Sequence, residues 1–323
     1  DGNEISSGTA KGMERIYFKE NFRRAHHTEP GRIDELPQIY DFYRQGFLRH
    51  LDRDQLMKTA PIVVVDLNHS PAAALLPDLL SDLGFDVTEL NSHVHEKTMD
   101  ITADKLDAAL DRLSRIVMTL EADAGFWIGP SGEKIRMVSA AGRAFSSREA
   151  LSLLAVLVCE AEDEGSLVVP VAAPQAVDSL ARGKGLNVQR TRSDGHSLVE
   201  AASNRHVRLV ASMDDRFGFP DFQPHFDGLF SIAKVMELSA RAGLSLDQAF
   251  AKLPGHTYHH LQLPCAWENK GGLMRRMSED AVDQRASFTD GVRIDTERGW
   301  VLLLPDEYRP IAHIYVEAAD QAD

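Results

Sequence analysis

Apolar runs and amphipathic stretches alternate along residues 54–165. Ile62–Val65 is a β-branched run without polar residues, which is typical of a buried parallel strand. Ser70 and Pro71 offer a helix cap and a first-turn proline, and leucines then recur at helical spacing as far as Gly84. The pattern also predicts strands at residues 85–90, 126–128 and 135–138 and helices at residues 103–120 and 148–160. One α/β unit is therefore predicted.

A second block with the same plan covers residues 166–262. Its apolar runs predict strands at residues 167–169, 186–190 and 207–211, and its amphipathic stretches predict helices at residues 174–181, 197–203, 226–242 and 246–252. Strand–helix alternation in two consecutive blocks predicts two tandem Rossmann-like mixed α/β domains.

The two ends of the chain follow other patterns. Residues 263–323 predict a helix at 271–280 and strands at 291–294, 300–304 and 312–317, which together indicate a small α+β domain with an antiparallel sheet. Residues 1–53 predict a strand at Arg15–Phe18 and a helix around Leu36–Leu51. They contain little that could form a core of its own.

Composition narrows the class of protein. Hydrophobic residues make up 43% and charged residues 26% of the chain, as in an ordinary globular protein. No apolar run approaches the roughly 20 residues of a membrane helix, so no membrane partner is expected. The formal net charge of −14 argues against a nucleic-acid surface. Two cysteines without Cys-x-x-Cys spacing favour a cytoplasmic location.

Short segments along the chain carry a resemblance to a known family. They are Ile62–Asp66, Ala122–Gly125, Phe219–Phe222, Asp227–Gly228, Leu253–Pro254, Asp290–Val292 and Ile314–Ala318. In this order they resemble the α-D-phosphohexomutases, which include phosphoglucomutase and phosphomannomutase. The resemblance implies that residues 54–165, 166–262 and 263–323 are mutase-like domains two, three and four. Residues 1–53 would be the tail of an incomplete first mutase domain plus a linker helix.

Three further segments resemble a fused variant of that family. Glu20–Arg24, Pro264–Gly271 and Leu304–Asp306 are similar to the mutase-like C-terminal region of bacterial sugar-1-phosphate nucleotidyltransferases of the mannose-1-phosphate guanylyl type. This resemblance implies an upstream nucleotidyltransferase domain or a homo-oligomer as the partner, and a chain that is a fragment of a longer protein.

The loop Gly129–Lys134 lies where the family has its metal loop. The family places three aspartates and an arginine there, whereas this chain has Gly129, Ser131 and Glu133 at the aspartate places and Lys134 at the arginine place. Mg²⁺ prefers hard carboxylate oxygens, and one carboxylate is a poor ligand set for it. No metal ligand and no catalytic residue is therefore assigned.

Two other family loops have changed in a similar way. Ser212 stands at the glutamate place of the sugar-recognition loop, and Leu304 stands at the arginine place of the phosphate loop. The resemblance implies that substrate contacts fall at family loop positions, which are Ser131, Glu133, Lys134, Ser212, Asp214, Arg216, Asp306 and Arg309. Asp306 brings negative charge to a place where a phosphate needs donors, and Arg309 offers a shifted phosphate fork.

These losses lead to a hypothesis about function. We expect a catalytically degenerate phosphohexomutase-like module in nucleotide-sugar or sugar-phosphate metabolism, with a binding, regulatory or scaffolding role. Its ligand would be a sugar phosphate or a nucleotide sugar, and no cofactor is expected. The alternative is an active phosphomannomutase or phosphoglucomutase with altered loops, and that reaction would need Mg²⁺.

The histidines of the segment 256–260 leave two interpretations open. His256, His259 and His260 have spacings that could face one side of a helix and bind a metal ion. The other interpretation is an exposed linker between the third and fourth domains, which the absence of an identifiable fourth ligand favours.

Overall fold

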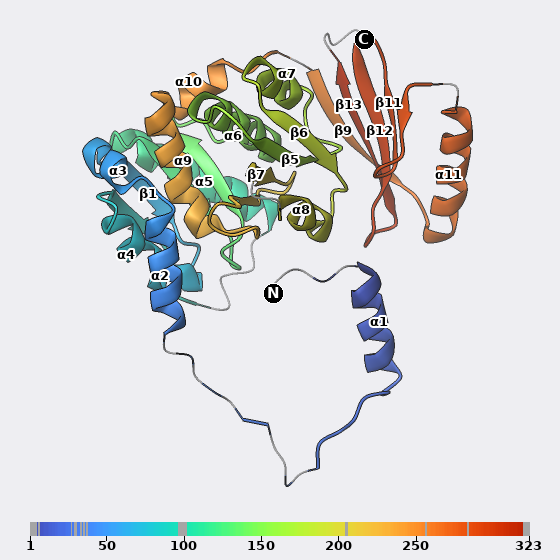
Figure 1. Cartoon of the computed structure of the whole chain (residues 1–323), viewed down its shortest axis with the longest axis horizontal. Helices are drawn as coiled ribbons and strands as arrows, with labels where there is room; N and C mark the ends of the chain where they lie inside the picture. The colour runs from blue at the N-terminus through green and yellow to red at the C-terminus, as the bar shows by residue number, and fades with distance from the viewer. Residues whose placement is uncertain are drawn as a thin grey trace.

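Three β-sheets follow one another along the chain (Figure 1). The computed structural model describes residues 5, 7–26, 28, 31, 32, 34, 36, 38–95, 102–203, 206–255, 257–282 and 284–318 of the 323-residue sequence. The strand orders are β2-β1-β3-β4, β6-β5-β7-β8 and β10-β11-β12-β13-β9. The predicted fold class, two mixed α/β units followed by an antiparallel sheet, is confirmed.

The first sheet consists of β1 (Ile62–Asp66), β2 (Asp86–Leu90), β3 (Ala124–Ile128) and β4 (Ile135–Ser139). β1 pairs in parallel with β2 on one side and β3 on the other, and β4 closes the sheet as an antiparallel hairpin partner of β3. Its helical segments are η1 (Pro71–Ala74), α4 (Leu76–Ser81), α5 (Ala103–Thr119) and α6 (Ser147–Ala161). The β1–β2 connection runs to one side of β1 and the β2–β3 connection crosses to its other side. The carboxyl ends of β1 and β3 therefore form a topological switch point, where α/β folds bind ligands.

The second sheet repeats this order with β5 (Ser166–Pro170), β6 (Asn187–Thr191), β7 (Val207–Ala211) and β8 (Phe217–Gly218). Its helices are α7 (Ala176–Gly183), α8 (Gly195–Ala202), α9 (Gly228–Ala242) and α10 (Leu246–Ala251). The short strand β8 was not predicted, because two residues carry no detectable alternation. Both α/β blocks agree with the sequence pattern to within a few residues at the element ends.

Helices α6 and α9 join these two sheets into one core. Leu151–Cys159 of α6 and Phe230–Leu238 of α9 are buried on nearly every side. Ser146 and Glu149 form a capping box at the start of α6, and Asp227 caps α9 through the backbone N–H of Phe230. The loops at the switch points are thus held on a shared apolar frame.

The third sheet is antiparallel throughout. It contains β9 (Thr257–Pro264), β10 (Ala286–Ser287), β11 (Val292–Asp295), β12 (Gly299–Pro305) and β13 (Ile311–Ala318), with α11 (Trp267–Asp280) beside it. β9 contradicts both interpretations of the histidine segment, since it is neither a helix nor a linker but a strand paired with β13. His259 and His260 therefore point to opposite faces, and His256 lies outside the described residues.

β9 also crosses the boundary placed between residues 262 and 263. The division into domains stays a prediction, because the three sheets alone do not define independent units. Lys270 and Gly271 lie inside α11, which begins four residues earlier than the predicted helix.

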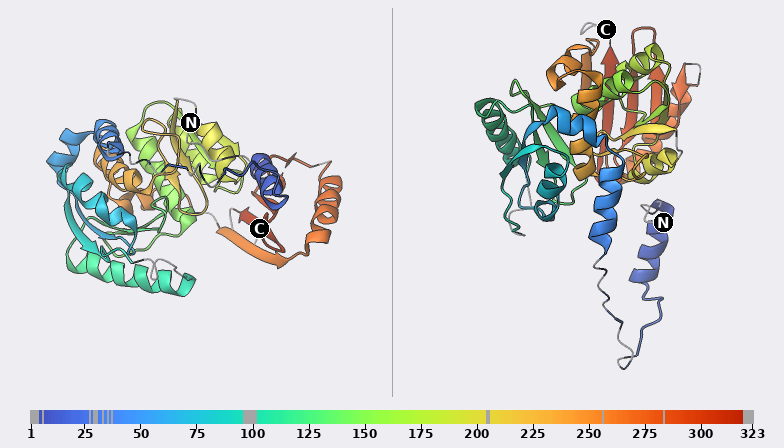
Figure 2. Two further views of the ribbon diagram at one scale, coloured as in Figure 1. Left: turned by 90° about the horizontal axis from the view of Figure 1, so that it is seen from below. Right: turned by 60° about the vertical axis from the view of Figure 1, so that its left-hand side comes forward.

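The N-terminal segment differs from the sequence prediction. Arg15–Phe18 is the end of helix α1 (Ser7–Phe18), not a strand. Met13, Ile16 and Tyr17 have the i, i+3, i+4 spacing of a helix, which a four-residue window could not reveal. Figure 2 shows α1 standing apart from the two α/β sheets, while α2 (Ile39–Arg49) and α3 (Arg53–Thr59) lead into the first sheet. Within the described part of the chain, no helix combines the length and apolarity needed to cross a membrane.

Candidate functional site

Two loops at the switch points of the first and second sheets meet in space. The backbone of Lys134 forms an isolated antiparallel bridge with Arg216, and the Ile135 N–H donates to the Asp215 carbonyl at 3.0 Å. The Gly228 N–H donates to the Gly132 carbonyl at 2.8 Å. A Cβ atom at Gly228 would lie 2.5 Å from that same oxygen, so only glycine allows the approach. The β3–β4 loop is therefore docked onto the segment that follows β7.

Asp214 is the centre of the resulting cluster. Its Oδ2 lies 3.0 Å from Lys134 Nζ, and its Oδ1 accepts a hydrogen bond of 3.0 Å from Arg216 Nε. The Ser212 hydroxyl donates to the same Oδ1 at 2.5 Å. We call Lys134, Ser212, Asp214 and Arg216 the Asp214 cluster. It brings together half of the predicted site residues, from loops about 80 positions apart in sequence.

The charge state of Asp214 follows from these partners. Burial raises the pKa of its carboxyl, but the Ser212 hydrogen bond and the charges of Arg216 and Lys134 outweigh burial and leave the pKa below its usual value. Asp214 is therefore ionised at neutral pH. Because it faces two cations, the cluster carries an excess of positive charge.

A second buried pair, Asp215 and Arg136, lies beside this cluster and was missed from the sequence. Arg136 Nη1 lies 3.5 Å from Asp215 Oδ2, and both side chains are largely shielded from solvent. Burial raises the pKa of Asp215, and the charge of Arg136 opposes that shift only in part. Asp215 has a φ of 71°, a left-handed conformation that costs a non-glycine residue free energy. The sequence signal that could have revealed this pair is the adjacent aspartates Asp214 and Asp215 in a loop that resembles the family.

Ser131 and Glu133 lie on the exposed side of the β3–β4 loop. The hydrogen bonds and ion pairs found within the described ranges include no partner for either side chain. The loop therefore turns only Lys134 toward Asp214.

Asp306 and Arg309 form a separate cluster in the turn between β12 and β13. Asp306 Oδ2 accepts from Arg309 Nε at 2.9 Å and lies 3.0 Å from His313 Nε2. His313 Nδ1 in turn lies 2.9 Å from His260 Nε2. We call these residues the Asp306 cluster. His260 and His313 were not predicted, since only the pairing of β9 with β13 places them together.

Arg309 is paired within its own turn, where its Nε and Nη2 both face Asp306 Oδ2. Burial raises the pKa of Asp306, but the backbone N–H of Tyr308, the His313 ring and Arg309 hold that pKa well below its usual range. Burial and the neighbouring His313 lower the pKa of His260. The charged groups of this cluster are thus hydrogen-bonded mainly to one another. In the described part of the chain, the cluster shares no hydrogen bond with the Asp214 cluster.

The residues at the β3–β4 loop do not fit a divalent cation. Among the residues that the structure describes, no group of three or more His, Cys, Asp or Glu side chains could hold a metal ion. Asp214, the nearest carboxylate to Lys134, is already neutralised by Lys134 and Arg216. A Mg²⁺ ion at this place would face two cations and one exposed glutamate, and so would be repelled.

Known proteins resemble this chain in sequence and in fold. No family model matches the chain. It is 25% identical over 311 residues to the phosphoglucomutase/phosphomannomutase of Thermococcus kodakarensis, covering 96% of this chain and 68% of that protein. It superposes on a phosphoglucomutase/phosphomannomutase family protein of Burkholderia thailandensis with a TM-score of 0.82 and 20% identity, over 99% of this chain and 68% of the other. The chain has the phosphohexomutase fold.

A third comparison concerns a structure with bound ligands. N-acetylphosphoglucosamine mutase of Aspergillus fumigatus, solved with GlcNAc-6P and magnesium, matches with a TM-score of 0.58 and 13% identity, over 87% of this chain and 67% of that one. The relatives support the phosphohexomutase superfamily inferred from the sequence. The loss of activity and the fusion to a nucleotidyltransferase stay predictions.

Proposed function

We propose that this chain binds a hexose phosphate at the Asp214 cluster, as the phosphate-recognising part of a phosphohexomutase-type protein. The meeting of the β3–β4 loop with the loop after β7 carries the proposal. It places Lys134 and Arg216 on either side of one carboxylate, at the edge of the sheets where α/β folds bind ligands.

A phosphate group suits this arrangement chemically. A phosphate monoester carries up to two negative charges and accepts hydrogen bonds on several oxygens, so it competes with Asp214 for Lys134 and Arg216. The Ser212 hydroxyl, now donating to Asp214, could turn to a phosphate oxygen. Asp214 would then hold both cations in position until the ligand arrives.

Two activities are compatible with such binding. The names of the relatives favour an active mutase on hexose phosphates over a degenerate module. The loop chemistry favours a binding module without phosphoryl transfer, because an ion pair between Lys134 and Asp214 occupies the place where carboxylates would hold Mg²⁺. A nucleotide sugar as ligand, a nucleotidyltransferase or second copy as partner, and a cytoplasmic location stay predictions.

Calorimetric titration of the 323-residue chain tests the binding step. Glucose 6-phosphate, mannose 6-phosphate and N-acetylglucosamine 6-phosphate are compared with glucose, which lacks the phosphate. Lys134→Gln should weaken binding by about tenfold or more, since a charged hydrogen bond contributes about 1.5–3 kcal/mol. Lys252→Gln, which removes an exposed lysine paired with Glu160, is the matched control. Equal affinity for glucose and its phosphates would refute the proposal.

Turnover separates the two activities. The chain is incubated with glucose 1-phosphate or mannose 1-phosphate, a hexose 1,6-bisphosphate and Mg²⁺, and the 6-phosphate is followed by a coupled assay. Conversion that stops when Mg²⁺ is chelated supports the mutase. Binding without conversion supports the binding module.

A further inference from the structure

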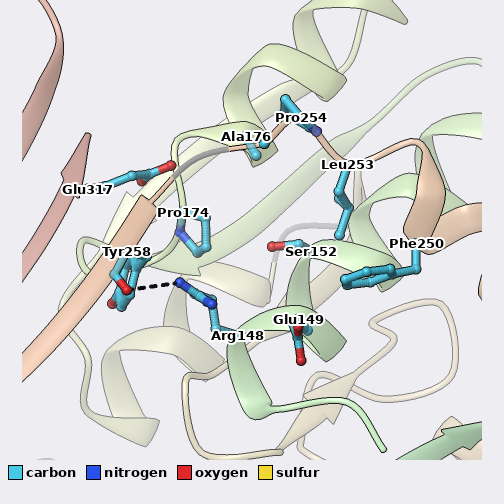
Figure 3. A pocket seen from close by; sticks show the side chains of 11 residues that line it. Arg148, Glu149, Ser152, Pro174, Ala176, Phe250, Leu253, Pro254, Tyr258 and Glu317 are labelled. Atoms are coloured by element: carbon cyan, nitrogen blue, oxygen red, sulfur yellow. Dashed lines mark hydrogen bonds between the residues drawn. The ribbon is translucent and has the colours of Figure 1, made fainter. Parts of the chain in front are cut away.

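A pocket of about 280 Å³ lies between α6, the segment after β5 and the third sheet, and none of its lining residues belongs to the Asp214 cluster (Figure 3). α6 contributes Arg148 and Ser152, and the connection after β5 contributes Pro174 and Ala176. The remaining walls come from α10, the α10–β9 connection and the third sheet, with Phe250, Leu253, Pro254, Tyr258 and Glu317. Its volume is just below the range of about 300–1,000 Å³ that drug-sized ligands occupy, so it suits a small molecule.

The charged groups around this pocket differ in how many of their polar atoms have hydrogen-bond partners. Glu149 accepts from Arg143 at 2.7 Å and from the Ser146 N–H and hydroxyl at 2.8 Å, as part of the helix cap. Both of its oxygens are therefore engaged. Glu317 is 2% exposed, and its Oε2 accepts from the Gln175 N–H at 2.8 Å and from Trp300 Nε1 at 2.7 Å.

Arg148 is the contrasting case. Its one hydrogen bond to a described residue is a long one, 3.5 Å from Nη1 to the Tyr258 carbonyl, and its guanidinium lies 4.6 Å from the Tyr258 ring centroid. Figure 3 shows the side chain reaching from α6 toward β9 along the wall of the pocket. A guanidinium has a fork of N–H donors that matches a carboxylate or phosphate, and most of that fork is left for a ligand.

Beyond Arg148, Glu149, Ser152, Tyr258 and Glu317, the lining of the pocket is apolar. Phe250 and Leu253 form one wall, and Pro174 and Ala176 form another (Figure 3). Pro174 and Ala176 are buried, so this surface belongs to the packed body of the protein. Among the residues that the structure describes, Glu317 accepts only from neutral donors and so keeps its negative charge. A ligand must therefore direct a negative head to Arg148 and an apolar body to the apolar walls.

We infer that this pocket binds a small organic anion, with its carboxylate or phosphate on Arg148 and an apolar ring or chain against Phe250, Leu253 and Pro174. This site is distinct from the hexose-phosphate site proposed above and does not depend on it. Because Arg148 lies on α6 and Tyr258 lies on β9 of the third sheet, a bound anion would tie α6 to that sheet and influence how the sheet is held.

The position of the pocket supports such a role. The chain enters the third sheet through Pro254 and Gly255, which line or border the pocket. Two polar contacts between the second and third sheets lie beside it: Glu317 with the Gln175 N–H, and the Tyr258 hydroxyl with the Ala172 carbonyl at 3.1 Å. An anion placed among these groups would add a further link across the junction.

Titration with matched fragments tests the site. Phenylacetate and phenyl phosphate carry the anionic head, 2-phenylethanol replaces it by a neutral group, and 2-phenylethylamine replaces it by a cation. We expect at least one of the two anions to bind about tenfold or more tightly than the alcohol and the amine, as the loss of a charged hydrogen bond implies. The stronger of the two anions identifies the head group. Equal binding of all four, or of none, would overturn the inference.

Variants and spectra locate the binding. Arg148→Met keeps an unbranched apolar stem but removes the guanidinium, so it should weaken anion binding about tenfold or more. Arg276→Met on the exposed side of α11 should leave binding unchanged. In the wild-type chain, the NMR signals of the Leu253 and Ala176 methyl groups should shift on titration and those of Leu273 should not. This readout needs no variant to fold. Shifts confined to Leu273, or full binding by Arg148→Met, would contradict the assignment, and hexose-phosphate titrations of both variants show whether the other site is separate.

Discussion

The Asp214 cluster and the Asp306 cluster each hold a carboxylate among cationic partners, but they are assembled over different distances. Asp214 receives Lys134 from another sheet, so the pair exists only when two loops dock. Asp306 receives Arg309 and two backbone N–H groups from its own turn, with His313 only seven residues away. The first cluster therefore forms only when the chain is folded. A ligand can compete with Asp214 for its two cations, Lys134 and Arg216. The second is a local turn in which Nε and Nη2 of Arg309 are paired with Asp306.

Gly228→Ala should have the largest effect on stability, because it disturbs the contact between the two loops that form the Asp214 cluster. The new Cβ would lie 2.5 Å from the Gly132 carbonyl oxygen, so one of the two loops must move. We expect a loss of about 1–3 kcal/mol in the free energy of unfolding, as for overpacked sites. Urea denaturation measures it.

Gly271→Ala in α11 is the control, since nothing lies within 4 Å of a Cβ atom there. Alanine favours a helix over glycine by up to about 1 kcal/mol, so this variant should be unchanged or more stable. Equal stability of Gly228→Ala and the wild type would mean that the two loops are not tightly docked.

Asp214→Asn should separate stability from binding. Losing the ion pairs with Lys134 and Arg216 should cost about 1 kcal/mol, because these side chains are partly exposed and solvent screens them. The same change frees both cations, so affinity for a hexose 6-phosphate should rise. Asp306→Asn should leave that affinity unchanged. Calorimetry on both variants decides, and a fall in affinity for Asp214→Asn would show that the carboxylate itself contacts the ligand.

Much of the fold could be predicted from the sequence, because buried strands and amphipathic helices leave local patterns. Ile62–Val65 became β1, and the predicted helix at residues 226–242 became α9 with its Gly243 cap. β9 was missed since its partner β13 comes some fifty residues later, and an exposed edge strand with burial on neither face has little alternation. Strand pairing of that kind is not visible in any local window.

The site could be predicted only as a set of loops. The family resemblance placed Lys134 in the metal loop and Asp214 in the sugar-recognition loop, but no spacing rule could reveal that they form an ion pair. Arg136 and Asp215 were missed for the same reason, since a buried pair is defined by the packing around it. Arg309 pairs with a neighbour three residues away, a pairing that the sequence does not distinguish from an open fork. A phosphate contact of Arg309 stays a prediction.

Asp306 should make stability depend on acid pH. Its pKa in the folded chain lies well below the usual value, so its contribution is present above the pKa of the unfolded chain, near 3.9. That contribution is lost as pH falls through the folded pKa. Between pH 6 and pH 3, Asp306→Asn should therefore lose less stability than the wild type, by about 0.5–1 kcal/mol. Parallel slopes in urea denaturation across this range would show that the turn does not favour the ionised form.

Glu133→Gln should have the smallest effect on stability. It tests whether the β3–β4 loop acts through the ion pair of Lys134 and Asp214 or through a metal ion. Glu133 is exposed, and no hydrogen bond or ion pair to a residue that the structure describes holds its side chain, so the free energy of unfolding should change by less than about 0.5 kcal/mol. Hexose-phosphate binding should also persist, because Lys134 and Arg216 provide the positive charge. If Glu133 instead helped to hold Mg²⁺, the variant would lose a Mg²⁺-dependent part of that affinity, while Ser131→Ala would lose less. Titrations with Mg²⁺ and with a chelator therefore decide whether the lysine–aspartate pair has replaced the metal or only stands beside it.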